Sequence, residues 1–425
     1  MGEASTGAGV PDELERRLGV SDAVLVGLGS MIGAGIFAAL APAARAAGSG
    51  LLPALAAAAV VAYCNATSSA RLAARYPASG GTYVYGRERL GAFWGFLAGW
   101  GFVVGKTASC AAMALTVGAY VWPGREHAVA VAATVALTAV TCAGVRKSAW
   151  LTRAIVAVVL AVLAAVVVAS LTSGAADADR LGIGPDVTAG GVLEAGGLLF
   201  FAFAGYARIA TLGEEVRDPA RTIPRAIPIA LGIALAVYTL VAVSALVVLG
   251  PGRLAEASAP LTATVRAAGA GWLSPVVRTG AAVAALGSLL TLVLGVSRTT
   301  LAMARDHHLP HALAAVHPRS KVPQRAQLAV GAVVAVLAGV ADVRGAIGFS
   351  SFGVLAYYAV ANASAWTLTE REGRPPRIVP AAGLAGCLLL AFSLPLASTV
   401  AGAAVLAAGA CAYGVRHALT GRSAG

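Results

Sequence analysis

The stretch that decides the fold is residues 24–37, VLVGLGSMIGAGIF, an apolar segment interrupted by four glycines. Each glycine weakens a helix interior by about 1 kcal/mol relative to alanine, so this segment is predicted to break. Residues 196–206, GGLLFFAFAGY, carry a similar interruption. Two interpretations are open for such glycines. They either allow close packing of helices, or they mark a discontinuous helix whose backbone groups bind a ligand within the membrane.

The composition surrounding these stretches predicts a membrane protein. The chain has 425 residues, of which 58% are hydrophobic and only 12% are charged. A soluble domain carries about 25% charged residues, so this chain has too little polar side chain to cover a globular surface. One span needs about 20 apolar residues, which leaves room for roughly ten to twelve spans. The prediction is an all-α membrane protein with many spans, and a soluble enzyme, a disordered chain and a fibrous repeat are excluded.

Twelve apolar segments divide the chain, and their pattern suggests internal repetition. The glycine-rich segments are the first and the sixth, so each opens a set of five, as in inverted-repeat transporters. We therefore expect a tail at 1–20, repeats at 21–172 and 190–369, two further helices within 378–416 and a tail at 417–425. The segments are 22–45, 52–74, 93–120, 127–144, 150–172, 190–214, 225–249, 272–303, 326–342, 345–369, 378–396 and 398–416.

The basic residues indicate orientation rather than nucleic-acid binding. The net charge is +12, yet the 31 Lys and Arg residues are scattered over short loops. Most of them lie on one set of segment ends, which includes both termini. Cationic loops resist translocation, so both termini are predicted to be cytoplasmic in an integral cytoplasmic-membrane protein. The opposite loops carry Arg125, Arg180, Arg253, Arg266 and Arg344.

Several motifs, in order along residues 21–325, resemble those of amino acid permeases of the amino acid–polyamine–organocation superfamily. The cationic amino acid transporter branch is the most similar. The motifs are GSMIGAGIF at 29–37, RYPASGGTYVY at 75–85, FFAFAGY at 200–206, EEVRDP at 214–219, TIPR at 222–225, AMARD at 302–306 and His317-Pro318.

The resemblance implies a leucine-transporter-like fold with broken helices 1 and 6 and a central site reached by alternating access. Backbone N–H groups at the first break would receive a substrate carboxylate, and carbonyls at the second would receive its ammonium group. Helix termini suit these roles, because unpaired donors lie at one end and unpaired acceptors at the other. The candidate binding residues are Ser30, Ile32, Gly33, Ala34, Gly35, Phe200, Ala202, Phe203 and Ala204.

Lys106 stands at the middle of the third segment, where a charge costs on the order of 3 kcal/mol. It is either structural, by snorkelling or by bonding broken-helix carbonyls, or a coupling group whose neutral form burial favours. In some proton-coupled relatives a lysine of the fifth span is thought to replace sodium, but the aligned residue here is Val159. Further gating candidates are Arg208, Glu214 and Glu215.

The acidic residues all lie in loops or at segment ends, so a cationic substrate would meet repulsion from Lys106 and Arg208. We expect a secondary transporter that imports a neutral amino acid with protons. The alternatives are an amino acid exchanger and a non-transporting, ligand-binding sensor of the same fold. Nothing in the sequence resembles an enzyme motif. No cofactor besides the proton, no metal, no nucleic acid and no obligate protein partner is expected, only substrate and lipid.

The remaining chemistry-bearing side chains are assigned to structural roles. Four histidines cluster after the eighth segment, where a solvated loop is favoured over a metal site. The five cysteines lie inside or at the ends of apolar segments, which argues against a disulfide framework. The histidines are His307, His308, His311 and His317, and the cysteines are Cys64, Cys110, Cys142, Cys387 and Cys411.

Overall fold

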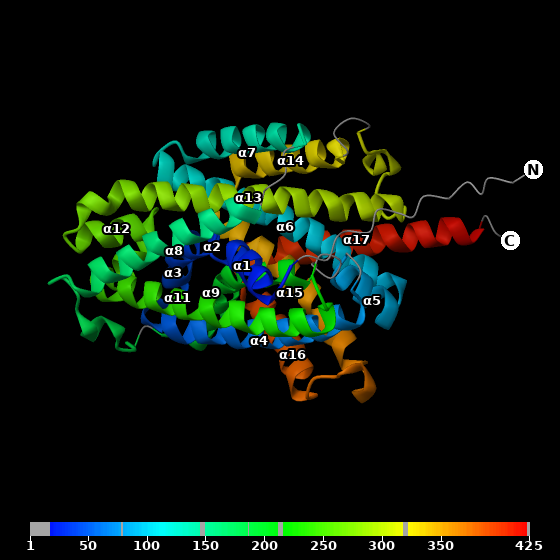
Figure 1. Ribbon diagram of the computed structural model, residues 1–425, viewed down its shortest axis with the longest axis horizontal. Helices are drawn as coiled ribbons and strands as arrows, with labels where there is room; N and C mark the ends of the chain where they lie inside the picture. The colour runs from blue at the N-terminus through cyan, green and yellow to red at the C-terminus, as the bar shows by residue number, and fades with distance from the viewer. Residues whose placement is uncertain are drawn as a thin grey trace, which may run out of the picture.

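The structure, a computed structural model, describes residues 18–77, 80–144, 149–185, 187–210, 216–317 and 322–422. These residues form helices and their connections, with one isolated β-bridge between Leu18 and Val216. Figure 1 shows the long helices running along the longest axis of the molecule. The α-helices are α1 (Val20–Met31), α2 (Ala34–Ala38), α3 (Leu40–Ala47), α4 (Leu51–Arg75), α5 (Thr82–Leu90), α6 (Ala92–Val121), α7 (Glu126–Cys142), α8 (Ala149–Leu171), α9 (Ala189–Phe203), α10 (Ala207–Ala210), α11 (Pro219–Glu256), α12 (Pro260–Ala267), α13 (Ser274–Arg305), α14 (Gln324–Val340), α15 (Val343–Trp366), α16 (Ile378–Ser393) and α17 (Leu396–Arg422).

The apolar helices match the predicted spans. Within the described ranges, nine helices or interrupted helices are long and apolar enough to cross a membrane, and α7, α14 and α16 are shorter apolar helices. Each of the twelve lies on one of the predicted segments. The prediction of an all-α membrane protein is therefore confirmed. The sequence analysis did not predict α5 and α12, which are short helices between spans.

Both predicted helix breaks are present. In the first, α1 ends at Met31 and α2 begins at Ala34, and the intervening Ile32 and Gly33 have non-helical backbone angles. In the second, α9 ends at Phe203 and is followed by the 3-10 turn η3 (Ala204–Tyr206) and then by α10. The glycine-rich stretches therefore interrupt their helices, as expected from their low helix propensity.

Helices of the two predicted repeats contact their counterparts. Among the contacts are those of α4 with α11, α6 with α13, α7 with α14, and α1 with η3. This pairing is what a two-fold relation between the halves would give, while the division into repeats stays a prediction. The most enclosed of the long apolar helices is α6, which carries Lys106 through the middle of the bundle.

Candidate substrate site

The two helix breaks lie against each other with no space for side chains between them. A Cβ atom added to Gly205 would lie 2.3 Å from the carbonyl oxygen of Ser30. A Cβ added to Gly35 would lie 2.6 Å from the Cα of Ala202. Glycine is required at both positions because the approaching atoms are backbone, which cannot rotate away. The close approach brings the predicted carboxylate side and the predicted ammonium side of the site together.

Helix α13 closes the third side of the first break. A Cβ on Gly33 would lie 1.9 Å from the hydroxyl oxygen of Ser288, so this glycine leaves room for the serine side chain. The Ser288 hydroxyl is buried and has no hydrogen-bond partner among the described residues. An unsatisfied buried hydroxyl is uncommon in native proteins. It places one uncommitted polar group directly against the break.

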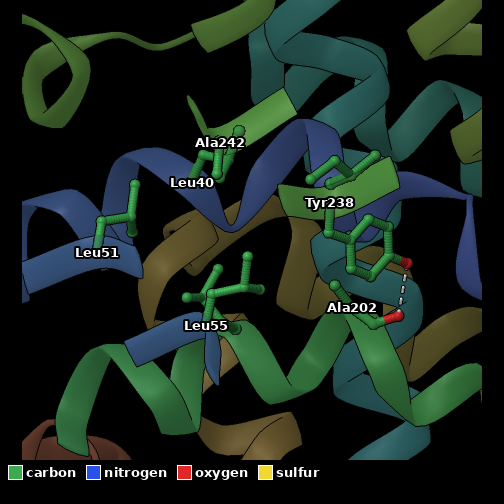
Figure 2. Close-up of a pocket in the computed structure, with 9 residues that line it drawn as sticks. Leu40, Leu51, Leu55, Ala202, Tyr238 and Ala242 are labelled. Carbon is green, nitrogen blue, oxygen red and sulfur yellow. Dashed lines mark hydrogen bonds between the residues drawn. The ribbon is translucent and has the colours of Figure 1, made fainter. Parts of the chain in front are cut away.

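Tyr238 of α11 links the two breaks. Its hydroxyl is 2.6 Å from the Met31 carbonyl oxygen and 3.0 Å from the Ala202 carbonyl oxygen, so it donates to carbonyls at both helix ends. Figure 2 shows the bond to Ala202. Carbonyls in the last turn of a helix lack partners along their own chain, and the tyrosine supplies one. The sequence analysis missed Tyr238, although it is the only aromatic residue between 207 and 271.

The predicted acceptor carbonyls are already occupied in this conformation. The Phe200 carbonyl accepts the Ala204 N–H inside the last helical turn. The Ala202 carbonyl accepts the Tyr238 hydroxyl, and the Ala204 carbonyl accepts the amine of Lys106. The ring of Phe203 packs edge-on against Tyr238, with ring centroids 5.1 Å apart. A substrate ammonium group would therefore compete with Tyr238 or Lys106 for these oxygens.

The predicted donors are less uniform. Gly33 precedes α2, and Ala34 and Gly35 are its first two residues, where backbone N–H groups have no helical partner. Ile32 is bonded through its N–H to the Leu28 carbonyl. Ser30 lies in the last turn of α1, where the N–H belongs to the helix ladder. The carboxylate site, if present, depends on residues 33–35.

Lys106 occupies the centre of the bundle. Its amine lies 3.4 Å from the Ala204 carbonyl oxygen and its side chain is only 7% exposed. Among the described residues, it is the only charged side chain in the buried class. Its position agrees with the alternative in which the lysine bonds a broken-helix carbonyl, and the amine does not snorkel to an interface.

The proposed inner-gate residues are only partly described. Arg208 lies in α10, directly after the second break, and is partly buried. Glu214 and Glu215 lie outside the described residues. The pairing of Arg208 with these carboxylates therefore stays a prediction.

A small cavity adjoins both breaks. Its volume is about 10 Å³, close to the minimum that one water molecule needs. Its lining is apolar except for the Tyr238 hydroxyl and backbone atoms, and Figure 2 shows how its residues converge. The cavity is too small for an amino acid, so the bundle is in a closed conformation. The lining residues are Gly35, Ile36, Leu40, Leu51, Leu55, Leu199, Ala202, Tyr238 and Ala242.

Aromatic side chains cover the other side of the second break. The rings of Tyr206 and Tyr358 are stacked with centroids 5.1 Å apart, and Phe200 meets Tyr358 edge-on at 5.9 Å. Tyr357 adds a further edge contact at 5.2 Å. These residues come from α9, η3 and α15, so their association was not predictable from spacing along the sequence.

Comparison with known proteins agrees with this architecture. The amino acid permease family model matches residues 18–410. The chain is 76% identical over 414 residues to an uncharacterized transporter of Mycobacterium tuberculosis, covering 97% of this chain and 94% of that protein. It is 24% identical over 413 residues to the branched-chain amino acid permease BcaP of Bacillus subtilis, covering 90% and 88%.

The similarity also extends to transporters named for cationic amino acids. The chain is 28% identical over 382 residues to cationic amino acid transporter 7 of Arabidopsis thaliana, covering 83% of this chain but only 65% of that protein. The family and these relatives are transporters, not enzymes. With its apolar helices, the chain is an integral membrane protein whose substrate is a small molecule, an amino acid. Because the family match covers nearly the whole chain, the chain belongs to the amino acid permeases of the amino acid–polyamine–organocation superfamily.

Proposed function

We propose that this permease is a secondary transporter that imports a neutral amino acid together with a proton by alternating access. One observation carries the choice of a neutral substrate: Lys106 is the only charged side chain among the described buried residues. A cationic substrate side chain would need a buried carboxylate, because an unpaired charge within the membrane is costly. Beside Lys106 it would meet repulsion instead.

The apolar cavity favours an aliphatic side chain. Leu51, Leu55 and Leu199 line it together with small residues, so a substrate entering an expanded form of this cavity would bury apolar surface. Its carboxylate would bond the N–H groups of Ala34 and Gly35. Its ammonium group would take the Ala202 carbonyl in place of the Tyr238 hydroxyl. The name of BcaP, a branched-chain amino acid permease, agrees with such a substrate.

Alternating access follows from the closed state. The cavity of about 10 Å³ cannot admit an amino acid, so binding requires the two breaks to separate. Their contact consists of small residues and backbone, with Gly35 against Ala202 and Gly205 against Ser30. Such a contact can open without removing large interlocked side chains. Substrate that binds the open arrangement better would shift the population toward it.

Lys106 is proposed to couple transport to protons. A protonated amine is attracted to the carbonyl dipole of Ala204, and a neutral amine bonds it more weakly. Loss of the proton would therefore loosen the contact between α6 and the second break. Protonation would thus bias the equilibrium between conformations, as a coupling ion must.

A binding screen on purified protein tests the substrate class. Leucine, isoleucine and valine should raise the melting temperature, because a ligand that binds only the folded state stabilises it. Lysine, arginine and glutamate should not. A shift with lysine or arginine alone would contradict the proposal. Binding of leucine without uptake into proteoliposomes would favour the non-transporting sensor.

A further inference from the structure

A second and larger cavity lies away from the substrate site, where the start of α6, the segment after α13 and the end of α17 meet. Its volume is about 380 Å³, within the range of small-molecule sites. Figure 1 shows α17 extending past the end of α13 on this side of the molecule. The side chains that carry the argument are those of Phe96, His307, His308, His311, Tyr413 and Arg416.

The lining has a positive bias. Arg416 contributes a permanent charge, and three imidazoles surround the opening. The nearest carboxylate, Asp306, is bonded by the Tyr83 hydroxyl, and the Arg87 guanidinium lies 3.6 Å from it. Its negative charge is therefore balanced outside the cavity. A ligand entering the cavity meets uncompensated positive charge, which favours an anion.

The histidines are held in place by the fold. His307 has a φ of +58°, a left-handed conformation that few residues other than glycine adopt. Its ring is stacked on His311 with centroids 5.1 Å apart. His308 lies 3.0 Å from the Tyr83 hydroxyl through its Nδ1, and partial burial lowers the pKa of its ring. A strained backbone of this kind is typical of functional segments.

The cavity lies at the depth of a membrane interface. Tyr413 follows the start of α17 at Leu396 by a length of about 26 Å, near the edge of a hydrocarbon core of about 30 Å. Trp94, near the start of α6, is 45% exposed, as is typical of residues in an interfacial aromatic belt. The exposed alanines Ala404, Ala408 and Ala412 form a smooth path from the cavity toward the membrane centre.

We propose that this cavity binds the phosphate-bearing headgroup of an anionic phospholipid. Arg416 and His311 contact the phosphate, Phe96 and Tyr413 cover the glycerol region, and an acyl chain follows the alanine face of α17. Basic pockets between membrane helices are suited to such headgroups. Since the cavity is formed by α6, α13 and α17, bound lipid would hold the ends of these helices together. The proposal concerns a site separate from the substrate site and does not depend on substrate identity.

Native mass spectrometry of detergent-purified protein tests the proposal with two short-chain probes, dioctanoyl phosphatidylglycerol and dioctanoyl phosphatidylcholine. Wild type should retain one phosphatidylglycerol more tightly than phosphatidylcholine. The double variant Arg416→Gln/His311→Gln should bind it about tenfold more weakly, as expected for lost charge-assisted hydrogen bonds. The matched control is Arg371→Gln, which removes an exposed charge elsewhere, and Arg416→Lys should retain binding. Melting temperatures show that each variant is folded.

Equal retention of phosphatidylglycerol by wild type and the double variant would overturn the proposal. Displacement of the lipid by an equal concentration of inorganic phosphate would also overturn it, because the site would then bind a free anion. If the double variant does not fold, the comparison of Arg416→Lys with the single variant Arg416→Gln decides. Weaker binding in Arg416→Gln alone supports the site, and equal binding in the two contradicts it.

Discussion

The side-chain amine of Lys106 lies 3.4 Å from the backbone carbonyl oxygen of Ala204, so the middle of α6 is bonded to the break in the sixth span. This contact joins the only charged side chain among the described buried residues to a segment that must move during transport. The bond strength depends on the charge of the amine, because hydrogen bonds from ionised donors are stronger than neutral ones. The relationship gives a physical route from a proton to a conformational change.

The first prediction concerns the contact between the breaks. In Gly35→Ala, the new Cβ would lie 2.6 Å from the Ala202 Cα, and neither backbone can yield without a shift. We expect the closed state to be destabilised by about 1–3 kcal/mol, as for overpacked cores, with loss of amino acid binding. Thermal unfolding and ligand-induced melting shifts measure both effects. Gly295→Ala is the control, since its Cβ would meet nothing within 4 Å. Equal behaviour of the two variants would refute this account.

The second prediction concerns Tyr238, whose hydroxyl occupies the Ala202 carbonyl. Tyr238→Phe should lower the stability of the empty protein by about 1–3 kcal/mol, because buried carbonyls lose a donor. It should also tighten leucine binding by up to about tenfold, because the ammonium group no longer displaces a hydroxyl. Calorimetric titration measures the affinity.

The control for this variant is Tyr120→Phe, which removes another buried tyrosine hydroxyl, one that donates to the Phe37 carbonyl at 3.1 Å. It should lower stability without tightening the binding of leucine. A weaker affinity in Tyr238→Phe would mean that the hydroxyl contacts the substrate directly.

The third prediction concerns pH and the loop after α15. The Thr369 backbone N–H and then Arg89 lower the pKa of Glu372 from 4.5 to about 2. Because this carboxyl pKa is depressed in the folded state, its stabilising contribution is present above pH 4.5 and is lost as the pH falls toward 2. Wild type should therefore melt higher than Glu372→Gln by a constant margin from pH 7 to 5.

That margin should shrink between pH 4.5 and 3. Glu370→Gln is the control, because the Glu370 side chain is 89% exposed and its bond to Arg374 is on the surface. It should show a small difference from wild type at every pH. A margin for Glu372→Gln that persists undiminished at pH 3 would contradict the pKa assignment.

The fourth prediction concerns orientation. In a background with Cys411, which is exposed, replaced by serine, Gly174→Cys should react with a membrane-impermeant maleimide in intact cells. Arg371→Cys should react only after permeabilisation, because the loops rich in basic residues are expected to be cytoplasmic. The reverse labelling pattern would invert the topology.

Some of these features could be predicted from sequence because their cause is local. Glycines interrupt a helix wherever they cluster, so the breaks near Gly33 and Gly205 were predictable. Lys106 was identifiable because a charge in an apolar segment is rare. Tyr238 could not be assigned a role, because its partner Met31 lies 207 positions away and the register between the helices decides the contact.

The second cavity illustrates the same limit. His307 and Tyr413 come from distant parts of the chain, and the histidines alone suggested only a solvated loop. The unpaired N–H groups were also only partly predictable, since they depend on the residue at which each helix ends. Ser30 falls on the helical side of that boundary, and Ala34 begins the next helix.

The central claim is tested most directly by uptake of radiolabelled leucine and arginine into proteoliposomes with an imposed pH gradient, alkaline inside. Wild type should accumulate leucine only with the gradient and with no response to sodium, and arginine should not accumulate. Lys106→Met, similar in volume but without the charge, should lose the response to pH, whereas Lys106→Arg keeps a charge that does not titrate and should lose it too. Uptake of arginine, or leucine uptake driven by a sodium gradient, would contradict the account.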